Sequence, residues 1–279
     1  MTRGSKRLTW GSSSIAECGM IRNIKLILEY DGTNYHGWQS QIGSGMATIQ
    51  DTLEQALMKL THEEVKTYSS GRTDAGVHAL GHVANFKTTS RIPPAAWAPA
   101  LNHLLPKDVR VLDSEEAPED FHARFSALGK LYTYRILNRR APSALYRRYA
   151  WHVNVPLNVR KMRLAAASFT GTQDFTSFRG SGCTAKTPVR TIQSLHIKKS
   201  NDFLEIGVEA NAFLQHMARN IAGTLVEVGL GRFSPDEMKR IIESRDRSAA
   251  GRTAPPQGLC LVKVYYPELV APSSGCSQL

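Results

Sequence analysis

Two apolar runs separated by a three-residue turn constrain the fold of this chain more than any other feature of its sequence. The runs span residues 189–199 and 203–210, and the turn between them is Ser200-Asn201-Asp202. A connection this short joins neighbouring antiparallel strands, because parallel strands need a crossover of a dozen or more residues. The pair therefore predicts a β-hairpin, and with it antiparallel sheet in the C-terminal half.

Further strand patterns alternate with amphipathic helix patterns along the whole chain. Strands are expected over residues 24–30, 65–70, 82–87, 109–114, 130–137 and 259–267. Helices are expected over residues 48–60, 94–106, 158–169 and 213–225, with a last helix from residue 234. Strands and helices that are mixed in this way, with hairpin connections, favour an α+β fold with mostly antiparallel sheet.

The length of 279 residues suits two domains of similar size. We expect an N-terminal α+β domain over residues 23–118 and a C-terminal α+β domain over residues 119–270. Residues 1–22 are expected to form a disordered N-terminal extension, and residues 271–279 a flexible tail, because both ends are rich in Ser and Gly and poor in apolar patterning.

The charge balance favours a polyanionic partner. Lys and Arg number 35 against 24 Asp and Glu, a formal net charge of +11, which suits nucleic acid or an anionic membrane surface. No apolar run approaches the roughly 18 residues of a membrane span, and the first 19 residues lack the apolar centre of a signal peptide. The four cysteines are scattered without a CxxC pair, so neither a zinc knuckle nor a disulfide framework is indicated. We expect a cytoplasmic protein that is not embedded in a membrane.

The stretch SSGRTDAGVHALGHVANF, residues 69–86, gathers ionisable side chains among glycines and allows three interpretations. In the first, TDAG is only a turn, since Asp bonds its own backbone and Gly adopts positive φ. In the second, Asp74, His78 and His82 bind a metal, because a spacing of four keeps them near one face and two His with one carboxylate form an open iron or zinc site. That face could belong to a helix or a strand, but Gly76 and Gly81 make a poor helix interior and no further ligand cluster in the sequence supports the site.

In the third interpretation Asp74 is a catalytic nucleophile or base. Arg72 lies two residues away, so in extended backbone both side chains face the same side. A neighbouring guanidinium favours the ionised carboxylate, and Gly71 and Gly76 let a bulky substrate approach the backbone closely.

Seven ordered motifs resemble the TruA family of tRNA pseudouridine synthases, and the match is collinear from about residue 24 to residue 267. The motifs are EYDGTNYHGWQSQ (29–41), TIQDTLEQAL (48–57), GRTDAGVHA (71–79), DFHARFSALGKLYTYRI (120–136), DFTSFR (174–179), ANAFLQHMARNIAGTLVEVG (210–229) and GLCLVKVYYP (258–267).

The resemblance implies an isomerase that converts uridine to pseudouridine at positions 38, 39 and 40 of the tRNA anticodon arm. The reaction breaks the N1–C1′ bond, rotates the uracil and joins C5 to C1′, so neither a cofactor nor a metal is expected. The chain has no phosphate loop or dinucleotide fingerprint. The implied fold is two related domains whose antiparallel sheets meet at a central active-site cleft. The implied partner is tRNA, which spans both subunits of a homodimer.

The resemblance also implies roles for single residues. Asp74 matches the catalytic aspartate, and Arg72 matches the residue that enters the space left by the flipped base. Arg219 matches an ion-pair partner of that aspartate. Tyr132 matches the tyrosine that stacks on the uracil, and Leu259 matches an apolar wall of the pocket.

Three further expectations complete the prediction. Tyr134 is expected to be an ordinary strand aromatic on the opposite face from Tyr132. His82 departs from the family, whose members commonly carry Gln there. Residues 134–151 interleave arginines with aromatic residues and are expected to track RNA phosphates; these arginines are Arg135, Arg139, Arg140, Arg147 and Arg148.

Overall fold

The computed structural model describes residues 20–41 and 45–267. Its strands are β1 (Arg22–Tyr30), β2 (Thr67–Ser69), β3 (His78–Thr88), β4 (Val109–Ala117), β5 (Gly129–Asn138), β6 (Trp151–Val153), β7 (Gly171–Asp174), β8 (Val189–Ser200), β9 (Phe203–Ala210) and β10 (Leu259–Tyr265). Its α-helices are α1 (Ile49–Thr61), α2 (Trp97–Leu104), α3 (Val159–Ala166), α4 (Met217–Gly229) and α5 (Glu237–Ser244). Every predicted strand and helix is present, and β6 and β7 are additional.

The strands form one sheet in the order β4-β1-β3-β10-β5-β9-β8-β7, with β2 paired to β3 and β6 paired to β5. All pairings are antiparallel except β3–β10 and β5–β6. The predicted hairpin is β8–β9, and Asn201 in its turn has the left-handed φ of 51°. The α+β class with mostly antiparallel sheet is therefore confirmed.

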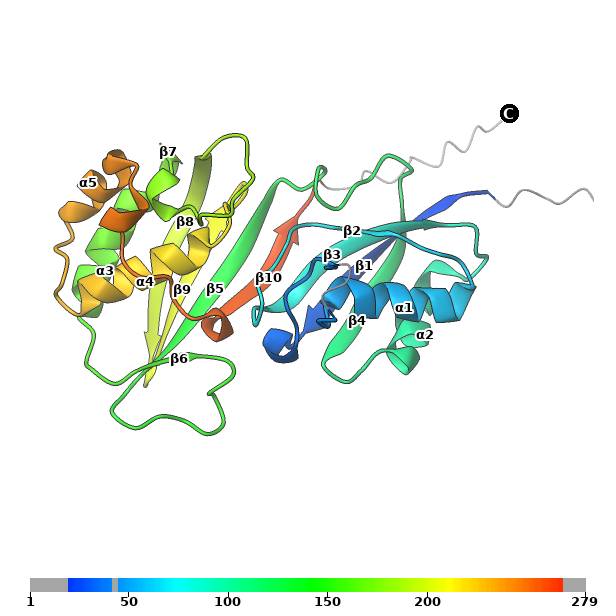
Figure 1. Cartoon of the computed structure of the whole chain (residues 1–279), viewed down its shortest axis with the longest axis horizontal. Helices are drawn as coiled ribbons and strands as arrows, with labels where there is room; N and C mark the ends of the chain where they lie inside the picture. The colour runs from blue at the N-terminus through cyan, green and yellow to red at the C-terminus, as the bar shows by residue number, and fades with distance from the viewer. Residues whose placement is uncertain (1–19, 42–44, 268–279) are drawn as a thin grey trace, which may run out of the picture.

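The two halves of the chain meet where β10 pairs with β3 (Figure 1). This parallel junction consists of two residue pairs, Cys260 with His78 and Leu261 with Ala79. On its other side β10 pairs with β5 over most of its length. Because the sheet runs through the junction, the division into domains at residues 118 and 119 stays a prediction.

The predicted boundary of the N-terminal extension, at residue 22, is wrong. Arg22, expected in the disordered extension, is the first residue of β1 and forms an ion pair with Glu116 of β4 at 2.7 Å. The other residues expected to be extended or flexible lie almost entirely outside the described part of the chain.

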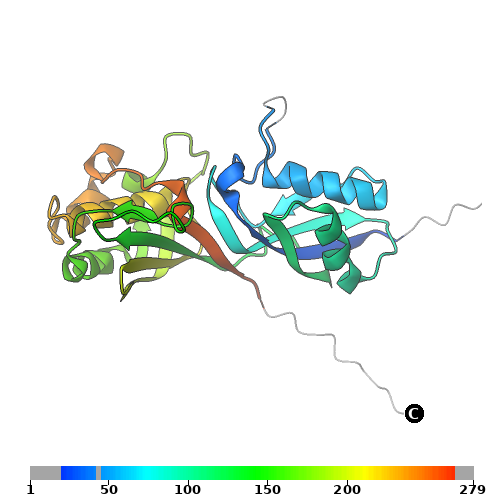
Figure 2. The ribbon, with the colours of Figure 1, turned by 90° about the horizontal axis from the view of Figure 1, so that it is seen from below.

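Helices cover the two ends of the sheet, and loops cover its middle. Helices α1 and α2 pack against each other over the β1–β4 half, whereas α3, α4 and α5 cover the other half (Figure 1). Seen from below, α1 lies on the same side of the sheet as α4 and α5 (Figure 2). The loops β2–β3, β9–α4 and α5–β10 lie between these two helical layers, above the central strands.

Local sequence signals account for the helix starts. Thr48 caps α1: its hydroxyl accepts the Asp51 N–H and donates to the Asp51 carboxylate. Helix α5 begins at Glu237 rather than at residue 234, but the Glu237 carboxylate still accepts the Ser234 N–H at 2.7 Å.

Helix α4 begins four residues later than predicted. His216 has the left-handed φ of 62°, so the backbone before Met217 forms a loop. Phe213 therefore lies in the β9–α4 loop instead of on the helix. No helix in the described ranges is both long and apolar enough to cross a membrane.

Candidate active site

The loop over residues 70–77, which carries Asp74, is held by the loop that follows β1. The Trp38 N–H donates to the Thr73 carbonyl at 3.1 Å, and the Gly76 N–H donates to the Tyr35 carbonyl at 3.2 Å. The Tyr30 hydroxyl lies 2.8 Å from Thr73 Oγ1. Hydrogen bonds on both sides of Asp74 thus fix the backbone that presents its carboxylate.

Two glycines allow these loops to pack backbone against backbone. A Cβ on Gly32 would collide with the Val77 carbonyl, and a Cβ on Gly37 would collide with the Thr73 carbonyl. Gly37 also has a φ of +85°, which side chains rarely adopt. The motifs YDGTNYHGW and GRTDAGVHA therefore pack directly against each other.

Asp74 is paired with an arginine of α4 and lies near a histidine of the loop before it. Arg219 Nη1 lies 2.9 Å from Asp74 Oδ2, and His216 Nε2 lies 3.6 Å from the same oxygen. Arg219 Nε donates to the Ala254 carbonyl at 2.8 Å, which fixes the guanidinium plane. The ion pair joins residues 145 positions apart and connects the two halves of the chain.

Tyr132 lies beside this ion pair on β5. Burial raises the pKa of its phenol, and the negative charge of Asp74 raises it further. Its ring packs edge-on against Phe213, with ring centres 4.8 Å apart. The neighbouring strand β10 contributes Leu259, which is buried and pairs in register with Tyr134.

The prediction that Tyr134 faces away from Tyr132 is wrong. Residues two apart in a strand point to the same face, and Tyr134 accordingly lies on the side of the site. Its hydroxyl donates to the Pro255 carbonyl at 2.7 Å, next to the Ala254 carbonyl that accepts from Arg219. Tyr134 therefore supports the segment that positions Arg219.

Arg72 and Lys130 add positive charge at the start of the loop that carries Asp74. Arg72 is exposed and, among the described residues, has no hydrogen bond or ion pair. Lys130 Nζ lies 2.8 Å from the position that a Cβ on Gly71 would take. Burial lowers the pKa of Lys130 to about 8, and the charge of Arg124 contributes.

The structure separates the three residues of the metal interpretation. His78 Nδ1 accepts the Gly32 N–H and its Nε2 donates to the Arg148 carbonyl, so both ring nitrogens are engaged. His82 points into the core behind the loop. Within residues 20–41 and 45–267, no three His, Cys, Asp or Glu side chains are grouped as metal ligands.

His82 supports the loop from behind. Its ring stacks on Trp38 at 4.1 Å, and its Nδ1 lies 3.2 Å from the Tyr30 hydroxyl that contacts Thr73. Burial lowers the pKa of His82 to about 3, with a contribution from the charge of Lys130, so the ring is neutral at physiological pH. Its Nε2 is buried without a hydrogen-bond partner.

Sequence reasoning missed three residues of this site: His216, Tyr134 and Tyr30. The spacing of three between His216 and Arg219 was an available signal, since it brings neighbouring side chains together at a helix start. Tyr30 carries no local signal, because its contact with Thr73 depends on how β1 and the loop are packed.

The arginine-rich run is largely exposed, as its composition suggests. Arg140, Arg147 and Arg148 are exposed in the loop between β5 and β6. Arg135 and Arg139 instead form surface ion pairs with Glu205 and Asp202, at 3.6 and 3.3 Å.

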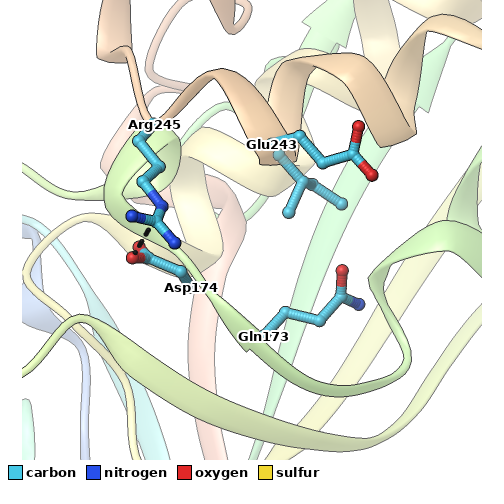
Figure 3. A pocket seen from close by; sticks show the side chains of 5 residues that line it. Gln173, Asp174, Glu243 and Arg245 are labelled. Atoms are coloured by element: carbon cyan, nitrogen blue, oxygen red, sulfur yellow. Dashed lines mark ion pairs between the residues drawn. The ribbon is translucent and has the colours of Figure 1, made fainter.

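A separate pocket of about 340 Å³ lies between β7 and α5 (Figure 3). It is lined by Gln173, Asp174, Ile242, Glu243 and Arg245. An ion pair of 3.2 Å joins Asp174 to Arg245 across it. None of these residues contacts Asp74, so the pocket is distinct from the candidate active site.

Comparison with known proteins points to the chemistry of the site. A family model described as tRNA pseudouridine synthase matches residues 26–126 and 165–267. The chain is 50% identical over 246 residues to tRNA pseudouridine synthase A of Acetivibrio thermocellus, covering 88% of this chain and all of that one. It is 51% identical over 247 residues to tRNA pseudouridine synthase A 2 of Clostridium perfringens, with the same coverage.

The close approach at Gly37 predicts a specific loss of stability. Gly37→Ala should lower the free energy of unfolding by about 2–4 kcal/mol, because it adds a collision to the cost of positive φ. Gly45→Ala is the matched control: its φ is +67°, but no atom lies within 4 Å of the added Cβ. Urea unfolding of both variants measures the difference. Equal losses would show that the loops do not pack this closely.

The buried His82 predicts a pH dependence. Its pKa is about 3 in the folded state and about 6.5 in the unfolded chain, so below pH 6.5 the unfolded state binds the extra proton. The free energy of unfolding should therefore fall as pH falls, by about 2 kcal/mol from this group between pH 7 and pH 5.

His82→Gln should remove that part of the pH dependence, whereas His103→Gln, at an exposed position, should not. Urea titrations of wild type and both variants at the two pH values make the measurement. An unchanged pH slope in His82→Gln would mean that this ring is not held neutral by burial.

Proposed function

The chain belongs to the tRNA pseudouridine synthase family, and we propose from this premise that it isomerises uridine to pseudouridine at positions 38, 39 and 40 of the tRNA anticodon stem-loop. The observation that carries the proposal is the Asp74 carboxylate in GRTDAGVHA, paired with Arg219 at 2.9 Å beside Tyr132. A carboxylate that is paired with a guanidinium and lies beside an aromatic ring suits chemistry at the C1′ of a nucleoside.

We assign the chemical step to Asp74. Its carboxylate attacks C1′ or abstracts the C2′ proton, and the N1–C1′ bond breaks with its electron pair going to the uracil. The base then rotates and C5 bonds to C1′. This bond formation displaces the Asp74 carboxylate from C1′ in the first route, and in the second route it is accompanied by return of the abstracted proton to C2′. The proton on C5 then leaves and N1 acquires one. Atoms and electrons balance within the nucleoside, so the step needs no redox partner. Both routes require the ionised carboxylate, which the Arg219 charge favours.

The neighbouring side chains receive supporting roles. Tyr132 would stack on the extruded uracil, and its raised pKa keeps the phenol protonated, so it donates rather than accepts a proton. Leu259 would form an apolar wall of the pocket. Arg72, exposed and without a partner among the described residues, is free to enter the space that the flipped base leaves.

The basic surface would supply RNA affinity. Arg140, Arg147 and Arg148 are exposed in one loop, and the chain carries a net charge of +11. A folded tRNA arm would be bound mainly through its phosphates and shape. We further propose that the protein works in the cytoplasm as a homodimer, as the family resemblance implies. The family model matches two separate segments, which supports a division into two related domains.

Tritium release tests this function directly. Purified protein is incubated with tRNA that carries tritium at uracil C5, in the presence of EDTA and without cofactor. Isomerisation releases the label to water. Absence of release, or release only with added metal, would contradict the proposal.

We predict that Asp74→Asn reduces pseudouridine formation to background, while the protein stays folded and binds tRNA about as well. Asparagine retains the size and turn preference of aspartate, but its amide cannot act as nucleophile or base. Binding should tighten slightly, because a negative charge is lost from a site that faces RNA. Single-turnover assays and filter binding at fixed salt measure both quantities.

Asp113→Asn, at an exposed position on β4, is the matched control and should retain full activity. Substantial isomerase activity in folded Asp74→Asn would contradict the catalytic role of Asp74 and would leave the GRTDAGVHA stretch with only a structural role as a turn.

Tyr132 variants separate stacking from the hydroxyl group. Tyr132→Phe keeps the ring, whereas Tyr132→Ala removes it, so alanine should cost roughly 1–3 kcal/mol more in transition-state stabilisation. The measurement is the single-turnover rate at saturating and limiting tRNA, corrected for the folded fraction from thermal melts. Equal losses in the two variants would assign the role to the hydroxyl instead.

A further inference from the structure

Four aromatic and basic side chains form an exposed cluster beside the candidate active site. This aromatic patch consists of Tyr68 on β2 and His122, Arg124 and Phe125 in the segment between β4 and β5. Ring centres are 5.0 Å apart for Tyr68 and His122 and 4.4 Å apart for His122 and Phe125. The Arg124 guanidinium lies 5.6 Å from the Phe125 ring. Phe125 is 76% exposed and Tyr68 is 38% exposed, so the patch presents ring surface to solvent.

The patch adjoins the segment that carries Asp74. The connection between β4 and β5 passes close to β2 (Figure 1), and the ring contact of Tyr68 with His122 joins the two. Tyr68 precedes Asp74 by six residues, which limits their Cα separation to about 21 Å. Between them, the Ser69 hydroxyl donates to the Gly71 carbonyl at 3.1 Å and stiffens the segment.

The patch and the neighbouring start of the Asp74 loop carry cations without acidic partners. Arg72, Arg124 and Lys130 form no ion pair within the described part of the chain. Lys130 Nζ lies 2.8 Å from the position of a Cβ on Gly71, at the start of the loop that carries Asp74, and the charge of Arg124 in the patch acts on it. Burial, and then the charge of Arg124, lower the pKa of His122. A neutral ring flanked by unpaired cations suits a ligand with both flat bases and phosphates.

We propose that the aromatic patch stacks unpaired nucleotides next to the target uridine of the RNA, which rests on the proposed function. Single-stranded RNA is recognised by stacking of splayed bases on aromatic rings and guanidinium planes, with nearby cations on the phosphates. The patch itself offers ring faces and a guanidinium, and the loop that carries Asp74 and the start of β5 add two further cations, Arg72 and Lys130. This charge complementarity favours RNA over a second copy of the basic chain.

The test compares Phe125→Ala, Phe125→Trp and Leu164→Ala. Leu164 is a matched control, because it is 59% exposed on α3, away from the patch. For each variant, affinity for an unmodified tRNA transcript is measured by filter binding at fixed salt, together with the single-turnover isomerisation rate. Phe125→Ala should weaken binding by about tenfold, whereas Phe125→Trp and Leu164→Ala should bind as the wild type does.

A second transcript tests whether Phe125 contacts the bases next to the target uridine. In a transcript with abasic nucleotides on both sides of the target uridine, the difference between wild type and Phe125→Ala should disappear. A difference that persists with the abasic transcript would overturn the assignment to stacking.

Other outcomes are equally decisive. If the wild type isomerises uridine but Phe125→Ala binds normally, the patch has no such role and the proposed function stands. If the wild type has no isomerase activity, the proposed function fails, while the binding series still tests the patch. If Phe125→Ala instead abolishes self-association in sedimentation velocity, the patch is an interface between copies and the inference is overturned.

Discussion

The packing of backbone against backbone between residues 32–38 and 73–77 is the constraint on which the site depends. Side chains cannot intervene there, because Gly32 and Gly37 leave no room for a Cβ. The Asp74 loop is therefore positioned by main-chain hydrogen bonds and by the Tyr30 hydroxyl rather than by adaptable side chains. A carboxylate presented from such a loop has little freedom to relax away from a substrate, which is how a flexible-looking glycine-rich sequence yields a preorganised group.

Electrostatics then connects the two halves of the molecule. A single carboxylate, Asp74, faces Arg219 and His216 from α4 and its preceding loop. Arg219 is itself held by the Ala254 carbonyl, and Tyr134 supports the adjacent Pro255. The excess of positive charge over negative charge in this region suits a site that must bring one carboxylate close to a polyanion without repelling it.

Much of the fold was predictable, because strand and hairpin patterns are local. The β8–β9 hairpin follows from its turn, and α1 follows from the Thr48 cap. Strands β6 and β7 are only three and four residues long, too short to give a periodic signal. The start of α4 was missed because a left-handed His216 interrupts an otherwise continuous apolar spacing.

The site was predictable in part and for a different reason. Resemblance of motifs selected Asp74, Arg219 and Tyr132, and the structure brings these three together, although their roles stay predictions. The prediction that the Tyr134 side chain points away from Tyr132 was wrong, although strand geometry alone gives the correct orientation because the two residues are two positions apart. The contact of Tyr30 with Thr73 joins residues 43 positions apart and could not be inferred from local pattern. The β3–β10 junction is equally non-local, since two residue pairs leave no sequence signature.

That junction has a consequence for synthesis of the protein. Strand β10 occupies the centre of the sheet, yet among the described strands it is the last to leave the ribosome. The preceding strands can pair as two partial sheets during translation, but each would expose an unpaired edge where β10 belongs. The emergence of residues 259–265 therefore closes both edges at once and brings Leu259 to the site in the same event. A nascent chain that stalls before this point would carry Asp74 and Arg219 but would lack the strand that joins their sheets.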